Sequence, residues 1–185
     1  MNRTGRITGN MLAVMLVLLS WGVSGANPVN VDFKGKLLDR PCRVAPESAS
    51  QDVVFRDTPA RQFWFWPGRT YNQRFSVKLV NCHSTTMGKT VRLVFRGGAE
   101  ASLPGYLAVT GVNAGRLGIG IVDTDGSTLL KVGDAHNRGA GEVVTGRNVT
   151  LNFMAYVQAT SDAITRKSVV PGTFQSVATF ELSYL

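Results

Sequence analysis

Short segments in which apolar and polar residues alternate recur along most of this chain. The clearest lies at residues 149–158, where an apolar set alternates with a mainly polar set: Val149, Leu151, Phe153, Ala155 and Val157 against Thr150, Asn152, Tyr156 and Gln158. Successive side chains of a β-strand point to opposite faces, so this period of two predicts a strand with one buried face. Helical periodicity is weak, and only Ser161–Lys167 indicates a short helical turn. The pattern predicts a mainly β fold.

The same alternation, separated by turn residues, predicts further strands. Apolar positions repeat at residues 75–79, 91–95, 117–121 and 178–184, and a shorter apolar run occupies Val53–Phe55. Gly, Pro, Asn and Asp fill the gaps, and the Asp-Gly step in the segment 123–127 is typical of a β-hairpin turn. About seven short strands with turn signals are typical of an antiparallel immunoglobulin-like sandwich, with a closed barrel as the alternative.

The first 26 residues have the organisation of an export signal. Arg3 and Arg6 form a basic start, an apolar run follows at Met11–Leu19, and the small residues Ser24-Gly25-Ala26 provide a cleavage site. We expect cleavage after Ala26, with cleavage after Gly25 or an uncleaved anchor as alternatives. About 160 residues then remain, which is enough for one domain with a hydrophobic core.

Charge and cysteine usage narrow the function classes. The formal charge of +8 falls to +6 when the two arginines of the signal are removed. The remaining basic residues are scattered, which favours a solvated surface over nucleic-acid binding. In an exported protein, Cys42 and Cys82 predict a single disulfide, which contributes about 3–4 kcal/mol by closing a long loop. Two cysteines and two distant histidines, His83 and His136, do not have the paired spacing of zinc ligands.

The sequence contains no recognisable catalytic or metal-binding pattern, so we expect neither an enzyme nor a cofactor. Its histidines and serines show no spacing that indicates a nucleophile with its base. The glycine-rich segment 115–120 lies in a predicted strand and opens no helix, so its glycines indicate a bulge or a close backbone approach rather than a phosphate site. Asp123 and Asp125 lack a further ring of acids and favour a turn over calcium.

The aromatic run at residues 63–66 (Phe-Trp-Phe-Trp) is the most unusual surface candidate. Read as an extended segment, it directs one aromatic pair to the core and leaves the other partly exposed. One interpretation is core packing plus a protected sheet edge. A second makes Trp64 and Trp66 partner contacts, since aromatics are enriched at interfaces, and a third is stacking on a sugar ring.

The segment 27–38 contains another alternating strand, between the signal and Cys42. Its apolar side carries five residues: Val29, Val31, Phe33, Gly35 and Leu37. A strand at this position can pair within its own domain or with a neighbouring chain, and the alternation alone does not distinguish the two.

Several motifs, in this order, resemble pilus subunits that are assembled by the chaperone–usher route. They are the alternating strand followed by Gly35–Cys42 (GKLLDRPC), Val80-Asn81-Cys82 at a strand end, Val170-Pro171-Gly172, and the final alternating strand at 178–184. Within that family, the motifs LLDRPC (37–42), VTGVNAGRL (109–117), DTDGS (123–127) and KSVVPG (167–172) are similar to minor adaptor subunits of P pili, which join the tip fibre to the rod. Family members usually end in Tyr and a polar residue, whereas this chain ends in Tyr184-Leu185.

The resemblance implies an immunoglobulin-like domain at 39–185 that lacks its final strand and is completed by a donated one. It implies that the extension 27–38 is the donor strand and enters the groove of the preceding tip-fibre subunit. The groove edge and chaperone docking residues would be Ala178, Phe180, Leu182, Tyr184 and Leu185. The implied partners are a periplasmic chaperone, an outer-membrane usher and a following rod subunit, first in the periplasm and then in a surface pilus. The alternative function is a secreted sugar-binding module or a tip adhesin.

Overall fold

The computed structural model describes residues 41–185. The predicted signal (1–26) and the predicted donor strand (27–38) lie outside the described residues. The elements in chain order are β1 (Arg43–Val44), α1 (Pro46–Ala49), η1 (Ala60–Trp64), β2 (Gln73–Val80), η2 (Ser84–Thr86), β3 (Thr90–Gly97), β4 (Leu107–Ala108), β5 (Thr110–Gly111), β6 (Leu117–Val122), β7 (Leu129–Leu130), η3 (Asn137–Gly139), β8 (Glu142–Val143), β9 (Val149–Ala159), α2 (Ser161–Arg166), β10 (Phe174–Gln175) and β11 (Ala178–Tyr184).

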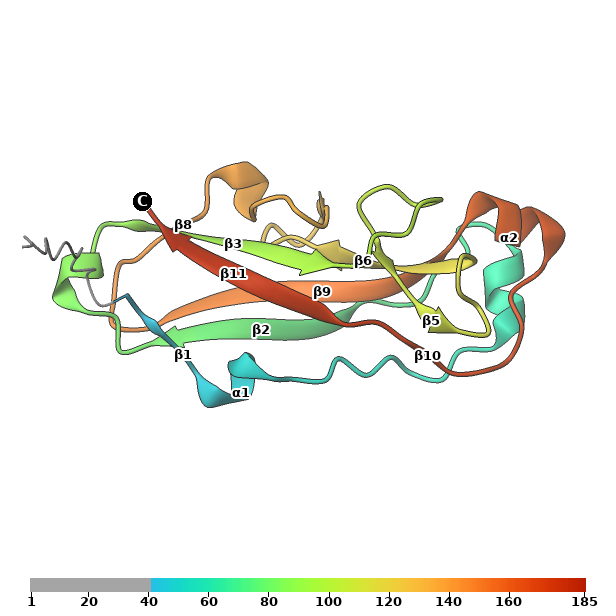
Figure 1. The fold of residues 1–185 in the computed structure, drawn as a ribbon, viewed down its shortest axis with the longest axis horizontal. Helices are drawn as coiled ribbons and strands as arrows, with labels where there is room; N and C mark the ends of the chain where they lie inside the picture. The colour runs from blue at the N-terminus through green and yellow to red at the C-terminus, as the bar shows by residue number, and fades with distance from the viewer. Residues whose placement is uncertain (1–40) are drawn as a thin grey trace, which may run out of the picture. The chain divides into compact units, whose positions relative to one another are not determined.

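The strands form two main antiparallel sheets, as the sequence predicts (Figure 1). In the larger sheet the order is β1-β2-β9-β6-β4, with β7 paired to β6. The second sheet has the order β11-β3-β8, and β10 pairs with β5 in a small two-stranded sheet. β9 therefore has a partner along both edges, because β2 and β6 flank it.

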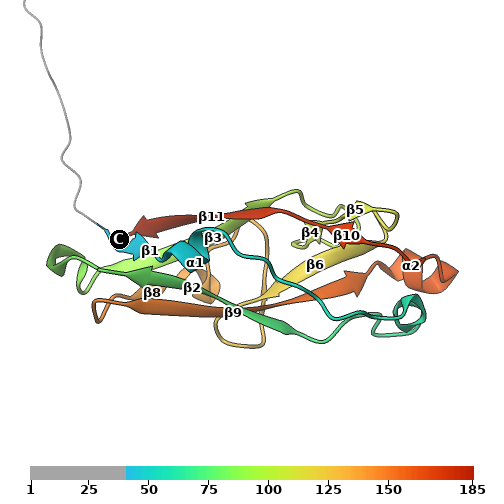
Figure 2. The same cartoon turned by 90° about the horizontal axis from the view of Figure 1, so that it is seen from below.

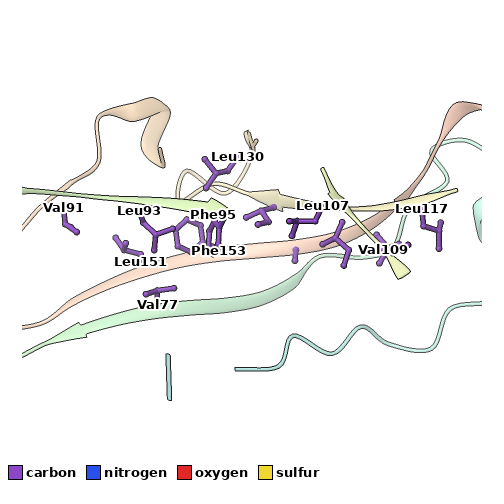
Figure 3. Packing of buried hydrophobic residues seen from close by; sticks show 14 of the residues in the cluster. Val77, Val91, Leu93, Phe95, Leu107, Val109, Leu117, Leu130, Leu151 and Phe153 are labelled. Carbon is purple, nitrogen blue, oxygen red and sulfur yellow. The ribbon is translucent and has the colours of Figure 1, made fainter. Parts of the chain in front are cut away.

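The core lies between the two main sheets, where the apolar sides of their strands meet (Figure 3). Phe153 of β9 packs against Phe95 of β3, with ring centroids 5.2 Å apart, and against Phe75 of β2 at 5.6 Å. The alternating apolar residues of β9 are all buried, with at most 8% of any of them exposed. Face-to-face packing of two antiparallel sheets confirms the predicted sandwich.

The glycine-rich segment in β6 is a site of close approach, which confirms that prediction. A side chain at Gly120 would come within 2.7 Å of both the Tyr106 and the Tyr156 rings. The two tyrosine hydroxyls are 2.7 Å apart and share a hydrogen bond above this glycine. The absence of a side chain at position 120 therefore lets two large rings pack on the strand.

The predicted hairpin after β6 also forms, because β6 pairs with β7. The Asp123 N–H donates to the Thr128 carbonyl at 2.8 Å across the turn. The buried Asp123 carboxylate accepts from the N–H groups of Thr124 and Asn137, at 2.7 and 2.8 Å. This aspartate therefore shapes the turn and ties it to the loop that begins η3.

Two local predictions were wrong. Val53–Phe55 is not a strand, and no backbone–backbone hydrogen bond joins residues 51–57 to any other described residue. The aromatic run does not alternate, because its first two residues end η1: Phe63 is buried, Trp64 is half-buried, and Phe65 and Trp66 are exposed. A turn of 3₁₀-helix replaces the period of two with a period of three, which changes the residues that share a face.

The predicted helical turn near residue 161 is confirmed as α2. The Thr160 hydroxyl caps it by accepting from the Ala163 N–H at 3.1 Å, and Lys167 ends it in a left-handed conformation. Over residues 41–185, none of the helices has the length and apolar character needed to cross a bilayer.

Candidate functional site

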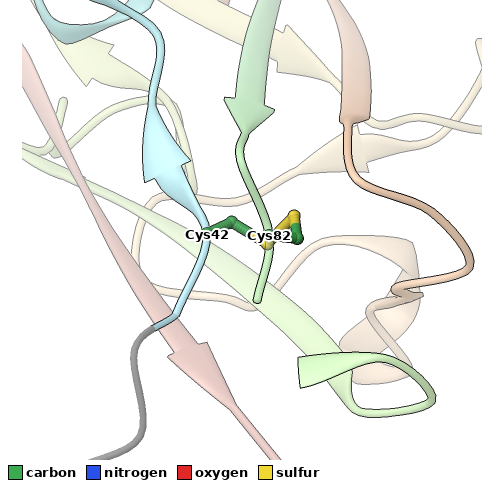
Figure 4. Close-up of a disulfide and its surroundings, with 2 residues drawn as sticks. All are labelled: Cys42 and Cys82. Carbon is green, nitrogen blue, oxygen red and sulfur yellow. A yellow bond between two sulfur atoms is a disulfide. The ribbon is translucent and has the colours of Figure 1, made fainter. Parts of the chain in front are cut away.

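A disulfide fixes the point at which the chain enters the described domain (Figure 4). Cys42 is bonded to Cys82, which confirms the predicted pair and links positions 40 residues apart. Cys42 comes just before β1, and Cys82 follows β2 and donates its N–H to the Arg147 carbonyl at 2.9 Å. The bridge therefore anchors the first described residues to the strand that pairs with β9.

The last strand, β11, is paired along only one of its two edges. Its residues pair with β3 from Ala178 opposite Gly97 to Tyr184 opposite Val91. The pairing extends to Leu185, which exchanges both backbone hydrogen bonds with Thr90, at 2.9 and 3.0 Å. Because β11 lies at the end of its sheet, no described strand pairs with its other side, which we call the open edge.

The register shows which backbone groups face the open edge. In an antiparallel pair, positions that exchange hydrogen bonds alternate with positions that do not. Leu185 and Thr90 exchange them, so the N–H and C=O groups of Ala178, Phe180, Leu182 and Tyr184 point away from β3. The hydrogen bonds of β3 support this register. Leu93 and Phe95 lie opposite Leu182 and Phe180, and their carbonyls point away from β11, where they accept from the N–H groups of His136 and Gly133.

The same residues of β11 carry the side chains that face the core. Phe180, Leu182 and Tyr184 are half-buried and pack against the core cluster, whereas Ala178 is exposed. The Phe180 ring lies 6.4 Å from that of Phe95. Burial raises the pKa of the Tyr184 hydroxyl, and the Cys42 backbone opposes this shift. The predicted alternation is therefore present, but with incomplete burial.

A second set of half-buried apolar side chains comes from the irregular segment between α1 and η1. Val53 and Phe55 pack against the core cluster, and the Phe55 ring lies 6.0 Å from that of Phe174 in β10. In Figure 1 this segment runs along the same side of the domain as β10 and β11. Residues 51–57 make no backbone–backbone hydrogen bond to any described residue. The open edge therefore combines unpaired backbone groups with apolar surface that is only partly covered.

The two tryptophans that the sequence offered as partner contacts differ in their surroundings. Trp64 is half-buried, and its Nε1–H donates to the Val169 carbonyl at 2.9 Å. Trp66 is 88% exposed. Only Trp66 therefore presents most of its ring to a partner.

Sequence reasoning missed a buried histidine behind β3. His136 is fully buried, and its Nδ1 accepts from the Leu93 N–H at 2.9 Å. Desolvation lowers the pKa of His136, although Asp123 opposes the shift. The ring therefore serves as a neutral acceptor that holds the loop against β3. No periodic pattern surrounds position 136, so the sequence carried no signal for this role.

Residues 41–185 bring no three metal-ligating side chains together. His83 is instead a local cap, because its Nδ1 accepts from the Thr85 N–H at 3.3 Å.

An all-β sandwich of two antiparallel sheets, with its last strand at a sheet edge, is the class of fold that these residues define. The fimbrial protein family model matches residues 31–185, and the chain belongs to that family. The chain is 52% identical to the fimbrial adapter PapK of Escherichia coli, over 96% of this chain and 97% of PapK. It is 51% identical to the protein PrsK of Escherichia coli, over 96% and 97% of the two chains. The crystal structure of the P pilus rod subunit PapA shares the fold, with a TM-score of 0.67 at 22% identity, over 79% of this chain and 100% of PapA.

Proposed function

We propose that this protein is a structural subunit of a chaperone–usher pilus, without enzymatic activity, that joins the tip fibre to the rod. The open edge of β11 is the observation that carries the proposal. The similarity to a fimbrial adapter over 96% of the chain supports the adaptor role and does not favour a tip adhesin.

A strand added at the open edge would supply the missing backbone hydrogen bonds and cover the apolar side chains there. It would pair with the outward N–H and C=O groups of Phe180, Leu182 and Tyr184, and its side chains would cover the half-buried apolar groups of the same residues. Donor-strand complementation of pilins is an established form of such β-augmentation. The occupant in the periplasm is a chaperone strand, and in the pilus it is the N-terminal strand of the following rod subunit.

The chaperone also has a charged group to recognise. Leu185 ends the chain as an exposed residue, and both of its backbone hydrogen bonds to Thr90 fix its position. A basic cleft in the chaperone would bind the terminal carboxylate and set the register of the incoming strand. The outer-membrane usher then exchanges this strand for that of the next subunit, and the finished polymer lies on the cell surface.

The N-terminal extension performs the complementary step in the preceding tip-fibre subunit. Burial of Val29, Val31, Phe33 and Leu37 in that groove contributes about 1.5–3 kcal/mol for each side chain as an upper value. Gly35 interrupts this row, and the lack of a side chain lets the two backbones approach closely at that position.

Expression in the periplasm with and without the cognate chaperone tests the open edge. We expect a soluble one-to-one complex with the chaperone, and degradation or aggregation without it, since the uncovered edge is prone to pairing with other chains. A stable, soluble monomer in the absence of chaperone would contradict the proposal.

Substitutions in the extension test donation separately. Gly35→Leu, or Val31→Asp combined with Phe33→Asp, should block insertion into the preceding subunit and leave the chaperone complex intact. Asn30→Asp, on the opposite side of the predicted strand, is the matched control and should assemble normally. Cross-linking of assembled pili, with mass spectrometry of the two neighbours, reports the outcome. Normal polymers from the Gly35 and the double aspartate variants would refute donation by this segment.

A further inference from the structure

Three exposed aromatic residues form a patch on the loop that follows η1. Phe65, Trp66 and Tyr71 are 56%, 88% and 83% exposed, and we call them the aromatic patch. They line one shallow depression of about 800 Å³ together with the polar residues Gln62, Arg69 and Asn72. Single exposed apolar residues are common, but a group of aromatics at one place marks an interaction surface.

The loop that carries the aromatic patch is held firmly to β9. The Gln158 amide donates to the Pro67 carbonyl at 2.7 Å, and the Ala159 N–H donates to the Gly68 carbonyl at 2.8 Å. The Arg69 guanidinium lies 3.6 Å from the Tyr156 ring centroid. A surface on a fixed backbone loses little conformational freedom when it binds, so this loop is organised in advance for a contact.

The aromatic patch lies at the opposite end of the described domain from the C-terminus. η1, which precedes the patch, contacts α2. Both views place α2 at one end of the sandwich and the C-terminus at the other (Figures 1 and 2). The described chain begins near the C-terminal end, because both views place β1 at the same end of the sandwich as the C-terminus (Figures 1 and 2). The first described residues therefore lie at the end that lacks the patch.

This geometry sets the direction of a donated strand, if the proposed function holds. A strand parallel to β11 would place its owner's folded domain at the Leu185 end, beside the first described residues, which connect to the segment proposed to bind the preceding subunit. An antiparallel strand separates the two neighbours, because it leaves the open edge at Ala178 and continues toward the aromatic patch.

The length of the N-terminal extension sets how far a donated strand can extend beyond the open edge. The segment 27–38 has twelve residues and spans about 40 Å as a strand, whereas the seven residues of β11 span about 23 Å. In this family member the folded domain follows the segment almost at once, since Cys42 is only four residues beyond Leu38. A following subunit with the same organisation would have its folded domain against the patch end.

We propose that the aromatic patch is the docking surface for the folded domain of the following pilus subunit. The contact adds to strand donation, on which it rests.

The basic residues around the aromatic patch indicate the chemistry of the partner surface. Lys167 Nζ lies 5.6 Å from the Phe65 ring centroid and Arg61 lies 6.0 Å from that of Trp64. Within residues 41–185, no ion pair involves Arg61, Arg69 or Lys167. The partner surface is therefore apolar with an acidic rim.

The test compares two probes on the same chaperone-bound subunit. One probe is the whole rod subunit of the same assembly system, bound to its chaperone, and the other is a synthetic peptide of that rod subunit's N-terminal strand. The variant is Trp66→Ala with Tyr71→Ala, and the control is Val143→Ala, another exposed apolar residue, in β8. Strand-exchange products and their dissociation are followed for both probes.

We expect the double variant to release the whole rod subunit about 10- to 30-fold faster than wild type, as for the loss of an aromatic hot spot. Its capture of the peptide should stay within about twofold, because the peptide has no folded domain to dock. The control should match wild type with both probes. Equal release of the whole subunit by variant and wild type overturns the docking proposal, and so does an equal loss with both probes. If wild type captures neither probe, strand donation itself fails and the docking proposal fails with it.

Discussion

β9 and β11 have the same alternating pattern in sequence but different surroundings in the fold. β9 is paired on both edges, and its apolar side is buried along its whole length. β11 is paired on one edge, and its apolar side is only half-buried. The two strands face the same core, so the difference lies in the missing neighbour rather than in the composition of the strands.

This difference distinguishes a part of the domain whose pairing is complete within the chain from an edge that, under the proposed function, a partner strand would complete. The sheet β2-β9-β6 has its hydrogen bonds and its burial from within the chain. The open edge leaves both incomplete. Substitutions in β9 should therefore change the stability of the fold, whereas substitutions in β11 should change the binding of the added strand.

The largest effect should come from the centre of β9. Phe153→Ala removes a buried ring that contacts Phe75 and Phe95, and it should lower the free energy of unfolding by about 3–5 kcal/mol. Urea denaturation of the subunit with a fused donor strand measures this loss. Thr150→Ala, on the exposed side of the same strand, is the control. A loss no larger than that of the control would show that β9 does not carry the core.

Removal of the disulfide should have the next largest effect. Cys42→Ser with Cys82→Ser releases a loop of 40 residues and should lower the free energy of unfolding by about 3–4 kcal/mol. Recovery of the chaperone complex should fall as well. The measurement is urea denaturation beside wild type with and without reductant. If the variant and oxidised wild type unfold at the same urea concentration, the bridge does not stabilise the domain.

Substitution in β11 should weaken strand binding more than it weakens the fold. Leu182→Ala removes a side chain that a donated strand would finish burying, so it should reduce the affinity for a donor-strand peptide by about 1–2 kcal/mol, or roughly 5- to 30-fold. Ser183→Ala, on the exposed side, should bind as wild type does. Peptide dissociation rates measure both variants. An unchanged rate for Leu182→Ala would remove this residue from the proposed contact.

A smaller effect should come from pH, through the region behind β3. Burial lowers the pKa of His136 below its ordinary value of 6.5, so the unfolded chain takes up its proton first as the pH falls. Stability should therefore be highest above pH 6.5 and decrease below it, until the folded state is protonated as well. His136→Asn should flatten the stability profile between pH 7 and 5, as measured by thermal unfolding. The same slope in both proteins would show that another group is responsible.

The strands that the sequence predicts correctly are those in which the alternating apolar residues face the core. The apolar positions of β9 and β11 could be read directly, because each strand has one side toward the core. Val53–Phe55 has the same short apolar pattern, but it lacks a neighbour to pair with, so no strand forms. Alternation reports which side of a segment is apolar and carries no information about whether a partner strand is present.

The parts of the site that could not be predicted depend on contacts between distant residues. Tyr106 and Tyr156 share a hydrogen bond although 50 positions separate them, and Leu93 donates to a histidine 43 positions away. The exposure of Trp66 follows from the turn of η1 and from the hydrogen bonds that fix the next residues to β9. None of these features has a local signature in sequence.

The disulfide at the entrance of the domain has a mechanical consequence. β1 pairs with β2 through only two residues, so tension on the N-terminal segment would separate that short ladder readily. The bond from Cys42 to Cys82 carries the load past β1 and directly into the end of β2, which is paired with β9 over seven positions. If the N-terminal segment links the subunit to its neighbour in a fibre, a pull on that segment would enter the domain beside the seven-position β2–β9 ladder, and the two-residue pairing of β1 with β2 would not carry it.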